Sequence, residues 1–223
     1  MATAVATGPT RTLEGERRFL LPGVGWEGYE ALLKMIGDRR VRVTFDGEDA
    51  ELMSPSQNHE FYKRIIGWML EALFEELNVP YEPAGSTTWR NRAGGLEPDE
   101  CYYLSNLALV RQKRNSLDLN ADPAPDLAVE IEISRGALDR LGLYAALGVA
   151  EVWRFDGETL RIERLQGDGT YQQITTSLAL PAITPDEVVH WARLAETTDD
   201  RLVWNRRFRQ WARAELVPRL ENR

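Results

Sequence analysis

The chain has 223 residues, 43% of them hydrophobic and 28% charged, so it is long enough for one domain with a substantial core or for two small ones, and its composition is that of an ordinary globular protein. Its formal net charge of -8 argues against a protein that coats nucleic acid non-specifically, because such binding depends on Lys and Arg side chains that neutralise phosphates. A single cysteine, Cys101, excludes an internal disulfide and a zinc site built from several thiolates, and we expect it to be a small buried residue.

The first residues are rich in Ala, Thr and Gly and have neither the positive start nor the apolar core of a signal peptide. We therefore expect a disordered tail over residues 1–14. No stretch approaches the roughly 20 apolar residues that a membrane helix needs. These features predict a cytoplasmic protein without a membrane partner.

The first half of the chain is expected to form a helix, a hairpin and then a long helix that packs on a sheet. Their ranges are 26–35, 42–45 paired with 51–53, and 59–77. Short extended segments at 81–83 and 86–89 follow, then a polar loop over 90–95 and a strand over 96–104 that is entered through Pro98.

The segment Pro125–Ser134 is predicted to be the central strand of the fold. Successive side chains of a strand point to opposite faces, so the odd positions from Leu127 to Ile133 form one wholly apolar face. The other face carries Asp126, Glu130 and Glu132 in a row. Two interpretations remain open: a divalent cation in a cleft compensates these carboxylates, or the strand lies at an edge with a solvated face.

The second half continues as an irregular stretch over 110–125, a helix over 137–147 stopped by Gly148, a hairpin, a further strand and two helices. The hairpin strands are 151–155 and 159–164, the further strand is 171–174, and the helices are 187–194 and 199–220. This order of elements predicts an α/β protein with a mixed central sheet flanked by helices and an amphipathic helix at the C-terminus.

Acidic residues stand near the start of two predicted strands. One strand carries Asp99, and the other carries Asp126, Glu130 and Glu132. If the strands are neighbours, Asp99 and Glu130 lie within reach of one metal ion, because adjacent strands are about 4.8 Å apart. Oxygen ligands of this kind suit Mg²⁺ or Mn²⁺. Such an ion positions water, lowers its pKa and neutralises charge on a phosphodiester.

Four sequence blocks follow one another along the chain: Leu52-Met53-Ser54-Pro55 followed by His59, Glu97-Pro98-Asp99, Pro125 to Glu130, and Leu143 to Trp153. Together they resemble the successive signatures of the Uma-two endonuclease family. The resemblance covers roughly residues 15–180 and leaves 181–223 as a C-terminal helical extension. It implies the restriction-endonuclease-like PD-(D/E)xK fold, Mg²⁺-dependent cleavage of phosphodiester bonds in DNA, and Asp99 and Glu130 as the metal ligands.

This chain departs from the superfamily pattern at the third residue of the acid-x-Lys element, where Glu132 stands in place of lysine. The family's lysine on the following helix corresponds here to Arg140. Arginine supplies charge and a fork of donors for a phosphate, but it does not give up its proton near neutral pH. Arg140 is thus expected to contact the scissile phosphate while Glu132 assists the metal or accepts a proton. The alternative for Arg140 is a salt bridge on the helix surface.

His59 stands at the start of the long helix, from which it can approach the site, although a lone histidine is more often structural. The terminal helix carries an apolar stripe that includes Trp204 and Phe208, next to arginines at 206, 207, 209 and 213. A stripe with no remaining core to cover favours a homodimer formed through this helix, and the arginines offer a second place for a phosphate backbone.

The sequence thus supports a Mg²⁺- or Mn²⁺-dependent DNA endonuclease in which Asp99, Glu130, Glu132 and Arg140 carry the chemistry and His59 is a possible addition. The alternative is a catalytically weak or inactive protein of the same fold that binds nucleic acid or another protein. A third hypothesis is a purely structural oligomer whose carboxylate face is simply solvated.

Overall fold

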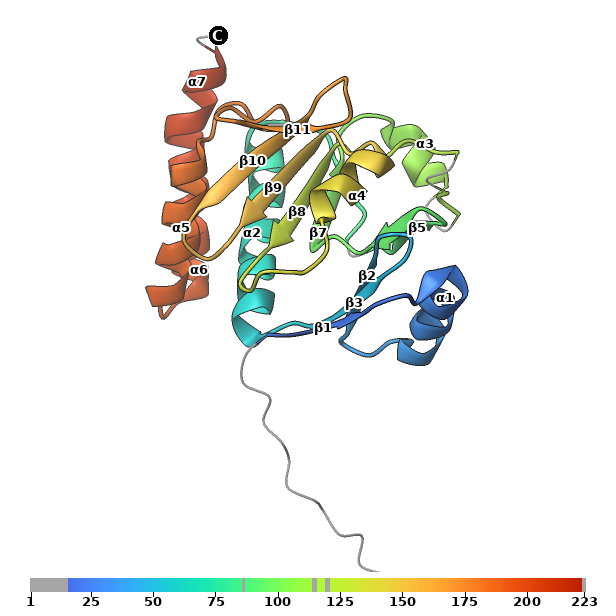
Figure 1. Cartoon of the computed structure of the whole chain (residues 1–223). Coiled ribbons are helices and arrows are strands. Elements are labelled where there is room, and N and C mark those ends of the chain that lie inside the picture. Colours follow the sequence, from blue (N-terminus) through green and yellow to red (C-terminus); the bar gives the residue numbers. More distant parts are fainter. Residues whose placement is uncertain (1–15, 86, 114–115, 119–120, 222–223) are drawn as a thin grey trace, which may run out of the picture.

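The computed structural model describes residues 16–85, 87–113, 116–118 and 121–221, so the expected tail over residues 1–14 lies outside the described part. Two sheets form the framework, and helices flank them (Figure 1). The larger sheet is mixed, as the sequence predicts.

The smaller sheet has the strand order β1-β3-β2-β6-β5 and is antiparallel throughout. Its strands are β1 Arg17–Leu21, β2 Arg42–Phe45, β3 Ala50–Ser54, β5 Trp89–Asn91 and β6 Gly94–Leu96. Helix α1, Gly25–Ile36, packs on this sheet through a cluster that includes Tyr29 and Phe45. The predicted hairpin of β2 and β3 is confirmed.

The expected polar loop over residues 90–95 is wrong, because β5 and β6 form a tight hairpin there. The side chain of Asn91 accepts hydrogen bonds from the backbone N–H groups of Ala93 (2.8 Å) and Gly94 (3.2 Å) and so closes the turn. An asparagine that mimics a backbone turn in this way was the local signal for a hairpin.

The larger sheet has the order β11-β10-β9-β8-β7-β4, with β8 and β9 parallel and every other pair antiparallel. Its strands are β4 Glu82–Pro83, β7 Glu100–Tyr103, β8 Leu127–Ile131, β9 Glu151–Phe155, β10 Leu160–Leu165 and β11 Tyr171–Ile174. Strand β8 lies between β7 and β9, which confirms a central strand and excludes the edge-strand interpretation.

The two faces of β8 differ as its alternation predicts. Leu127, Val129 and Ile131 belong to the main core, together with helices α2 (Gln57–Glu76), α5 (Pro185–Thr197) and α6 (Arg201–Trp211). Ala128 on the opposite face packs in a second core with helices α3 (Leu107–Gln112) and α4 (Arg140–Leu147). Figure 1 shows α4 in front of the larger sheet and α2 behind it. The carboxylates of β8 therefore lie on the α4 side.

Two helix boundaries differ from expectation. Helix α4 begins at Arg140 and not at residue 137, and it ends at Gly148, whose φ of 79° is a conformation that suits glycine. Helix α3, Leu107–Gln112, is not expected from the sequence, and its last three residues fall in the stretch expected to be irregular from residue 110. The cysteine expected to be buried, Cys101, is fully buried on β7.

The C-terminal helices are part of the main core. Helix α6 continues through a π-helical turn, Ala212–Leu216, into α7, Val217–Glu221, and its residues Trp204 and Phe208 are buried against α2 and α5. The premise that the apolar stripe has no core to cover is therefore wrong. Within the described residues, no helix combines the length and the apolar character needed to cross a membrane.

Candidate active site

Asp99 lies where the chain passes from the smaller sheet to the larger one. Strand β6 ends at Leu96 and β7 begins at Glu100, so the expected single strand over 96–104 is split by Glu97-Pro98-Asp99. The backbone N–H of Asp99 donates to the carbonyl of Val129 on β8 (3.0 Å). This bond sets Asp99 beside Glu130, as the metal-site hypothesis requires.

Both oxygens of the buried Asp99 carboxylate accept hydrogen bonds. Arg42 of β2 donates to Oδ1, Nε2 of His59 lies 2.7 Å from the same oxygen, and the N–H of Ile131 donates to Oδ2 (2.7 Å). Burial alone would raise the pKa of Asp99, but the hydrogen bond with His59 and the charge of Arg42 outweigh it and lower the pKa. Asp99 is a carboxylate anion held by cations.

His59 lies in the first turn of α2 and contacts Asp99 from there. The Ser56 hydroxyl caps this helix by accepting from the His59 N–H (3.1 Å). The two ring nitrogens of His59 lie between two carboxylates, with Nδ1 2.8 Å from Oε1 of Glu16. Burial lowers the pKa of His59, but its interactions with Asp99 and Glu16 prevail and raise the pKa to about 9.

Glu130 is paired with Arg140. The guanidinium donates from Nε to Oε2 (3.1 Å) and from Nη2 to Oε1 (2.5 Å), a bidentate arrangement, and the Tyr144 hydroxyl also donates to Oε1. Burial raises the pKa of Glu130, the charge of Arg140 opposes the rise and the charge of Asp99 adds to it.

Arg140 uses its remaining donors inside the protein as well. Its Nη1 donates to the Thr44 hydroxyl of β2, and Nη2 donates to the Glu97 carbonyl (2.9 Å). Only 14% of the side chain is exposed. The surface salt bridge considered for Arg140 is therefore wrong, and a phosphate contact would require it to give up partners.

The three carboxylates expected in a row on β8 have three separate partners. Asp126 turns to the loop after β7 and accepts from the N–H groups of Leu104 (2.7 Å) and Ser105 (2.9 Å). Glu132 forms a bidentate ion pair with Arg154 of β9 (2.8 and 3.0 Å). Only Glu130 of the three lies beside Asp99.

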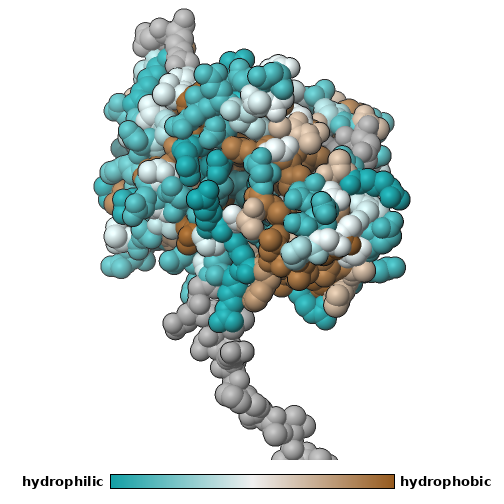
Figure 2. Space-filling model, in the orientation of Figure 1, coloured by the Kyte–Doolittle hydropathy of each residue, from teal (hydrophilic) through white to brown (hydrophobic). Residues whose placement is uncertain are grey.

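A cavity of about 660 Å³ opens in front of Glu130 and Glu132. Five arginines line it, and they come from β1, the segment after β8, α4, β9 and β10: Arg18, Arg135, Arg140, Arg154 and Arg161. Figure 2 shows a hydrophilic band beside an apolar area on the same face as α4. The cavity thus combines buried carboxylates with a high local density of guanidinium groups.

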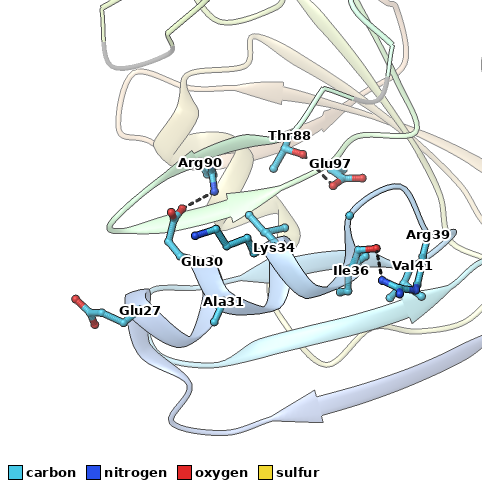
Figure 3. A pocket seen from close by; sticks show the side chains of 12 residues that line it. Glu27, Glu30, Ala31, Lys34, Ile36, Arg39, Val41, Thr88, Arg90 and Glu97 are labelled. Carbon is cyan, nitrogen blue, oxygen red and sulfur yellow. Dashed lines mark hydrogen bonds and ion pairs between the residues drawn. The ribbon is translucent and has the colours of Figure 1, made fainter.

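A second cavity of about 740 Å³ lies between α1 and the β5–β6 hairpin (Figure 3). Its walls carry an Arg90–Glu30 ion pair and a hydrogen bond from the Thr88 hydroxyl to Glu97 (2.9 Å). Neither Asp99 nor Glu130 lines it. The cavity in front of Glu130 is therefore the stronger candidate.

The residues around Asp99 and Glu130 do not fit a divalent cation in this arrangement. Each carboxylate oxygen accepts a hydrogen bond, and three positively charged side chains, Arg42, His59 and Arg140, fill the space where a metal ion would contact them. Across the described ranges, no three His, Cys, Asp or Glu side chains are placed to hold a metal ion.

Sequence reasoning missed several members of the site. Arg42, Thr44, Tyr144 and Glu16 each bind one of the residues that it did identify. The sequence signal for Arg42 was its place as a charged residue between apolar ones in a predicted strand. That this strand lies next to an acidic site is visible only in the structure. Tyr144 stands four residues after Arg140 and therefore on the same face of α4.

Comparisons with known proteins agree with this fold. A crystal structure described as that of a "putative nuclease" from Anabaena variabilis is similar to the chain, with a TM-score of 0.51 and 12% sequence identity over 73% of this chain and 97% of that chain. Among curated proteins, none matches. The profile of a family described as "Uma2: Putative restriction endonuclease" matches residues 26–196, most of the 223-residue chain. The chain therefore belongs to the Uma2 family.

Proposed function

We propose that this protein acts on the sugar-phosphate backbone of DNA as a nuclease. Membership of the family supports a nuclease function. The observation that carries the proposal is the cavity in which five arginines line the same walls as Glu130 and Glu132, with the buried Asp99 beside Glu130. Forked guanidinium groups match the geometry of phosphate oxygens, and carboxylates are the groups that nucleases use at the reacting phosphate.

The charge distribution favours an extended anion over a small neutral substrate. The chain is acidic overall, with a net charge of -8, yet five of its arginines line this one cavity. Four carboxylates, those of Glu130, Glu132, Asp139 and Asp156, line the same cavity, so the arginines exceed them by only one. A phosphate is therefore attracted by the guanidinium groups that it contacts and not by a large net positive charge. Arg135, which is exposed, and Arg161, which is half-buried, are positioned for the first contacts.

The protein's own residues have separate tasks in this proposal. Arg135 and Arg161 bind the backbone, while Arg42 and His59 hold the Asp99 carboxylate in one orientation. The dependence on Mg²⁺ or Mn²⁺ that the family resemblance implies, and the roles of Glu132 and His59 in catalysis, stay predictions. Both oxygens of the Glu130 carboxylate are bound by Arg140 in this arrangement.

A second candidate function is binding of DNA with slow cleavage or none. The bidentate pair of Arg140 with Glu130 favours it, because a buried arginine neither leaves this partner readily nor serves as a base. The two candidates share the DNA-binding cavity and differ only in the chemistry that follows.

Binding and cleavage are tested separately. Fluorescence anisotropy with a labelled DNA duplex in EDTA measures binding, and supercoiled plasmid with Mg²⁺ or Mn²⁺ measures cleavage. We expect the double variant R135Q and R161Q to weaken binding about tenfold or more at moderate salt and to flatten its salt dependence, since removal of each arginine that touches a phosphate reduces the slope by about one.

The matched control is the double variant R206Q and R207Q, which removes the same charge from exposed positions on α6. It should bind DNA as the wild type does. If this control loses binding while the cavity variant retains it, the terminal helix is the DNA-binding surface and the proposal is wrong. Cleavage that is abolished by Glu130→Gln identifies a nuclease, and unchanged binding without cleavage identifies the second candidate.

A further inference from the structure

Arg140 occupies a position that has the features of a cation site. Its guanidinium donates hydrogen bonds to oxygens from three parts of the fold. These are the Glu130 carboxylate on β8, the Thr44 hydroxyl on β2 and the Glu97 carbonyl between the sheets. Carboxylate, hydroxyl and carbonyl oxygens are the ligands that hard divalent cations take in proteins. Here they converge on a side chain of the protein itself.

We propose that Arg140 is a built-in cation that replaces a divalent metal ion at Glu130, so that the free protein binds no metal there while the guanidinium stays in place. Helix α4 fixes the position of the guanidinium relative to Glu130. Arg140 is the first residue of this helix, and Tyr144, one turn later, donates to the same carboxylate. A guanidinium cannot lose its proton to make room for a metal ion, as a lysine can.

Charge balance points in the same direction. The carboxylates of Asp99, Glu130 and Glu16 are already balanced by the guanidinium groups of Arg42 and Arg140 and by the imidazole of His59. A divalent cation added to this balanced set would bring two uncompensated positive charges into a low-dielectric interior that screens them poorly. Removal of Arg140 leaves Glu130 with an unpaired buried charge, which a metal ion can then satisfy.

The inference rests on the proposed function only in its choice of site, and its test needs no DNA. Isothermal calorimetry with Mn²⁺ compares the wild type with Arg140→Gln and with the double variant R140Q and E130Q. We expect no saturable binding by the wild type, saturable binding by R140Q, and loss of that binding in the double variant. Arg207→Gln, on the distant helix α6, is the matched control for loss of one positive charge and should behave as the wild type.

A second measurement keeps the test decisive if R140Q is poorly folded. Its melting temperature should be lower than that of the wild type without metal and should rise with Mn²⁺, whereas the melting temperature of the wild type should not respond. Arg140→Lys keeps the charge but loses the fork, and we expect it to fold, to bind Mn²⁺ weakly and to cleave DNA faster than the wild type if the nuclease function holds.

Two results would overturn the inference. One is saturable Mn²⁺ binding by the wild type that Glu130→Gln removes, because the metal ion would then coexist with Arg140. The other is a folded R140Q or R140K variant that binds no Mn²⁺. A failure of this kind leaves the anisotropy result intact, so it is distinguishable from a failure of the DNA-binding proposal.

Discussion

The buried charged side chains at the centre of the site stabilise one another as ion pairs. Glu130 has only 4% of its surface exposed and depends on Arg140 for its neutralisation, while the fully buried Asp99 depends on Arg42 and His59. Breaking one such buried pair typically costs about 3–5 kcal/mol, because the remaining charge is left without a partner. The residues that position the site therefore also stabilise the fold.

The raised pKa of His59 predicts how the stability of the protein depends on pH. Its folded pKa of about 9 lies above the ordinary value of 6.5, so its contribution is complete below about pH 6.5 and is lost as the pH rises through about 9. We expect the free energy of unfolding to fall by on the order of 3 kcal/mol between these limits. Urea unfolding at a series of pH values measures it.

Two substitutions separate His59 from other titrating groups. His59→Gln should be less stable at pH 6.5 and should lack the decline at higher pH. His190→Gln, at the exposed second histidine, should keep the decline. A decline that persists in the His59→Gln protein would assign it to another group.

At the scale of elements, the short strand β6 joins the smaller sheet to the helix that carries Arg140. A Cβ atom added at Gly94 would lie 2.5 Å from Cδ2 of Leu143 on α4 and 3.2 Å from the carbonyl oxygen of Phe45 on β2. The backbone of β6 therefore packs directly between α4 and β2. This close approach brings Thr44 and Glu97 within reach of Arg140.

Gly94→Ala tests this packing. The added methyl group must displace the tip of Leu143 and crowd the Phe45 carbonyl, so we expect a loss of about 1–3 kcal/mol in the free energy of unfolding. Gly167→Ala is the matched control, because a Cβ atom there meets nothing within 4 Å. Equal urea midpoints for the two variants would show that β6 and α4 are not tightly packed.

At the scale of the whole molecule, the terminal helices complete the main core. Phe208 and Trp204 of α6 are buried, and Arg209 forms ion pairs with Glu75 (2.8 Å) and Glu76 (2.9 Å) of α2. The apolar stripe is thus used within the chain. Dimer formation through this helix stays a prediction, but the stripe no longer supports it.

A pair of substitutions on α6 distinguishes a core helix from a dimer arm. Phe208→Ala should destabilise the protein by about 3–5 kcal/mol, because it leaves a cavity in the core. Leu202→Ala, at a position that is 57% exposed, should change stability by less than about 0.5 kcal/mol. Thermal unfolding and sedimentation are measured together. A Phe208→Ala protein of unchanged stability but half the wild-type mass would identify α6 as a dimer arm.

Local patterns predicted much of the fold. The alternation in β8, the helix periodicity of α2 and the turn signals of the β2–β3 hairpin are properties of neighbouring residues, and each is confirmed. The β5–β6 hairpin was missed because its strands have three residues each, too few for a period to show. The same brevity concealed the change of sheet at Pro98.

The sequence by itself determined the mixed α/β class, the family and the central place of β8, because strand parity and ordered motifs follow from positions along the chain. It placed Asp99 near Glu130 only on the condition that their strands are neighbours, and the pairing of β7 with β8 supplies that condition. Only the tertiary structure decided which cation neutralises each carboxylate. Arg42 lies 57 positions before Asp99, Thr44 lies 96 before Arg140, and no local period connects such residues. Their meeting depends on two sheets and α4 packing together, and a buried charge must find its partner wherever that packing brings one.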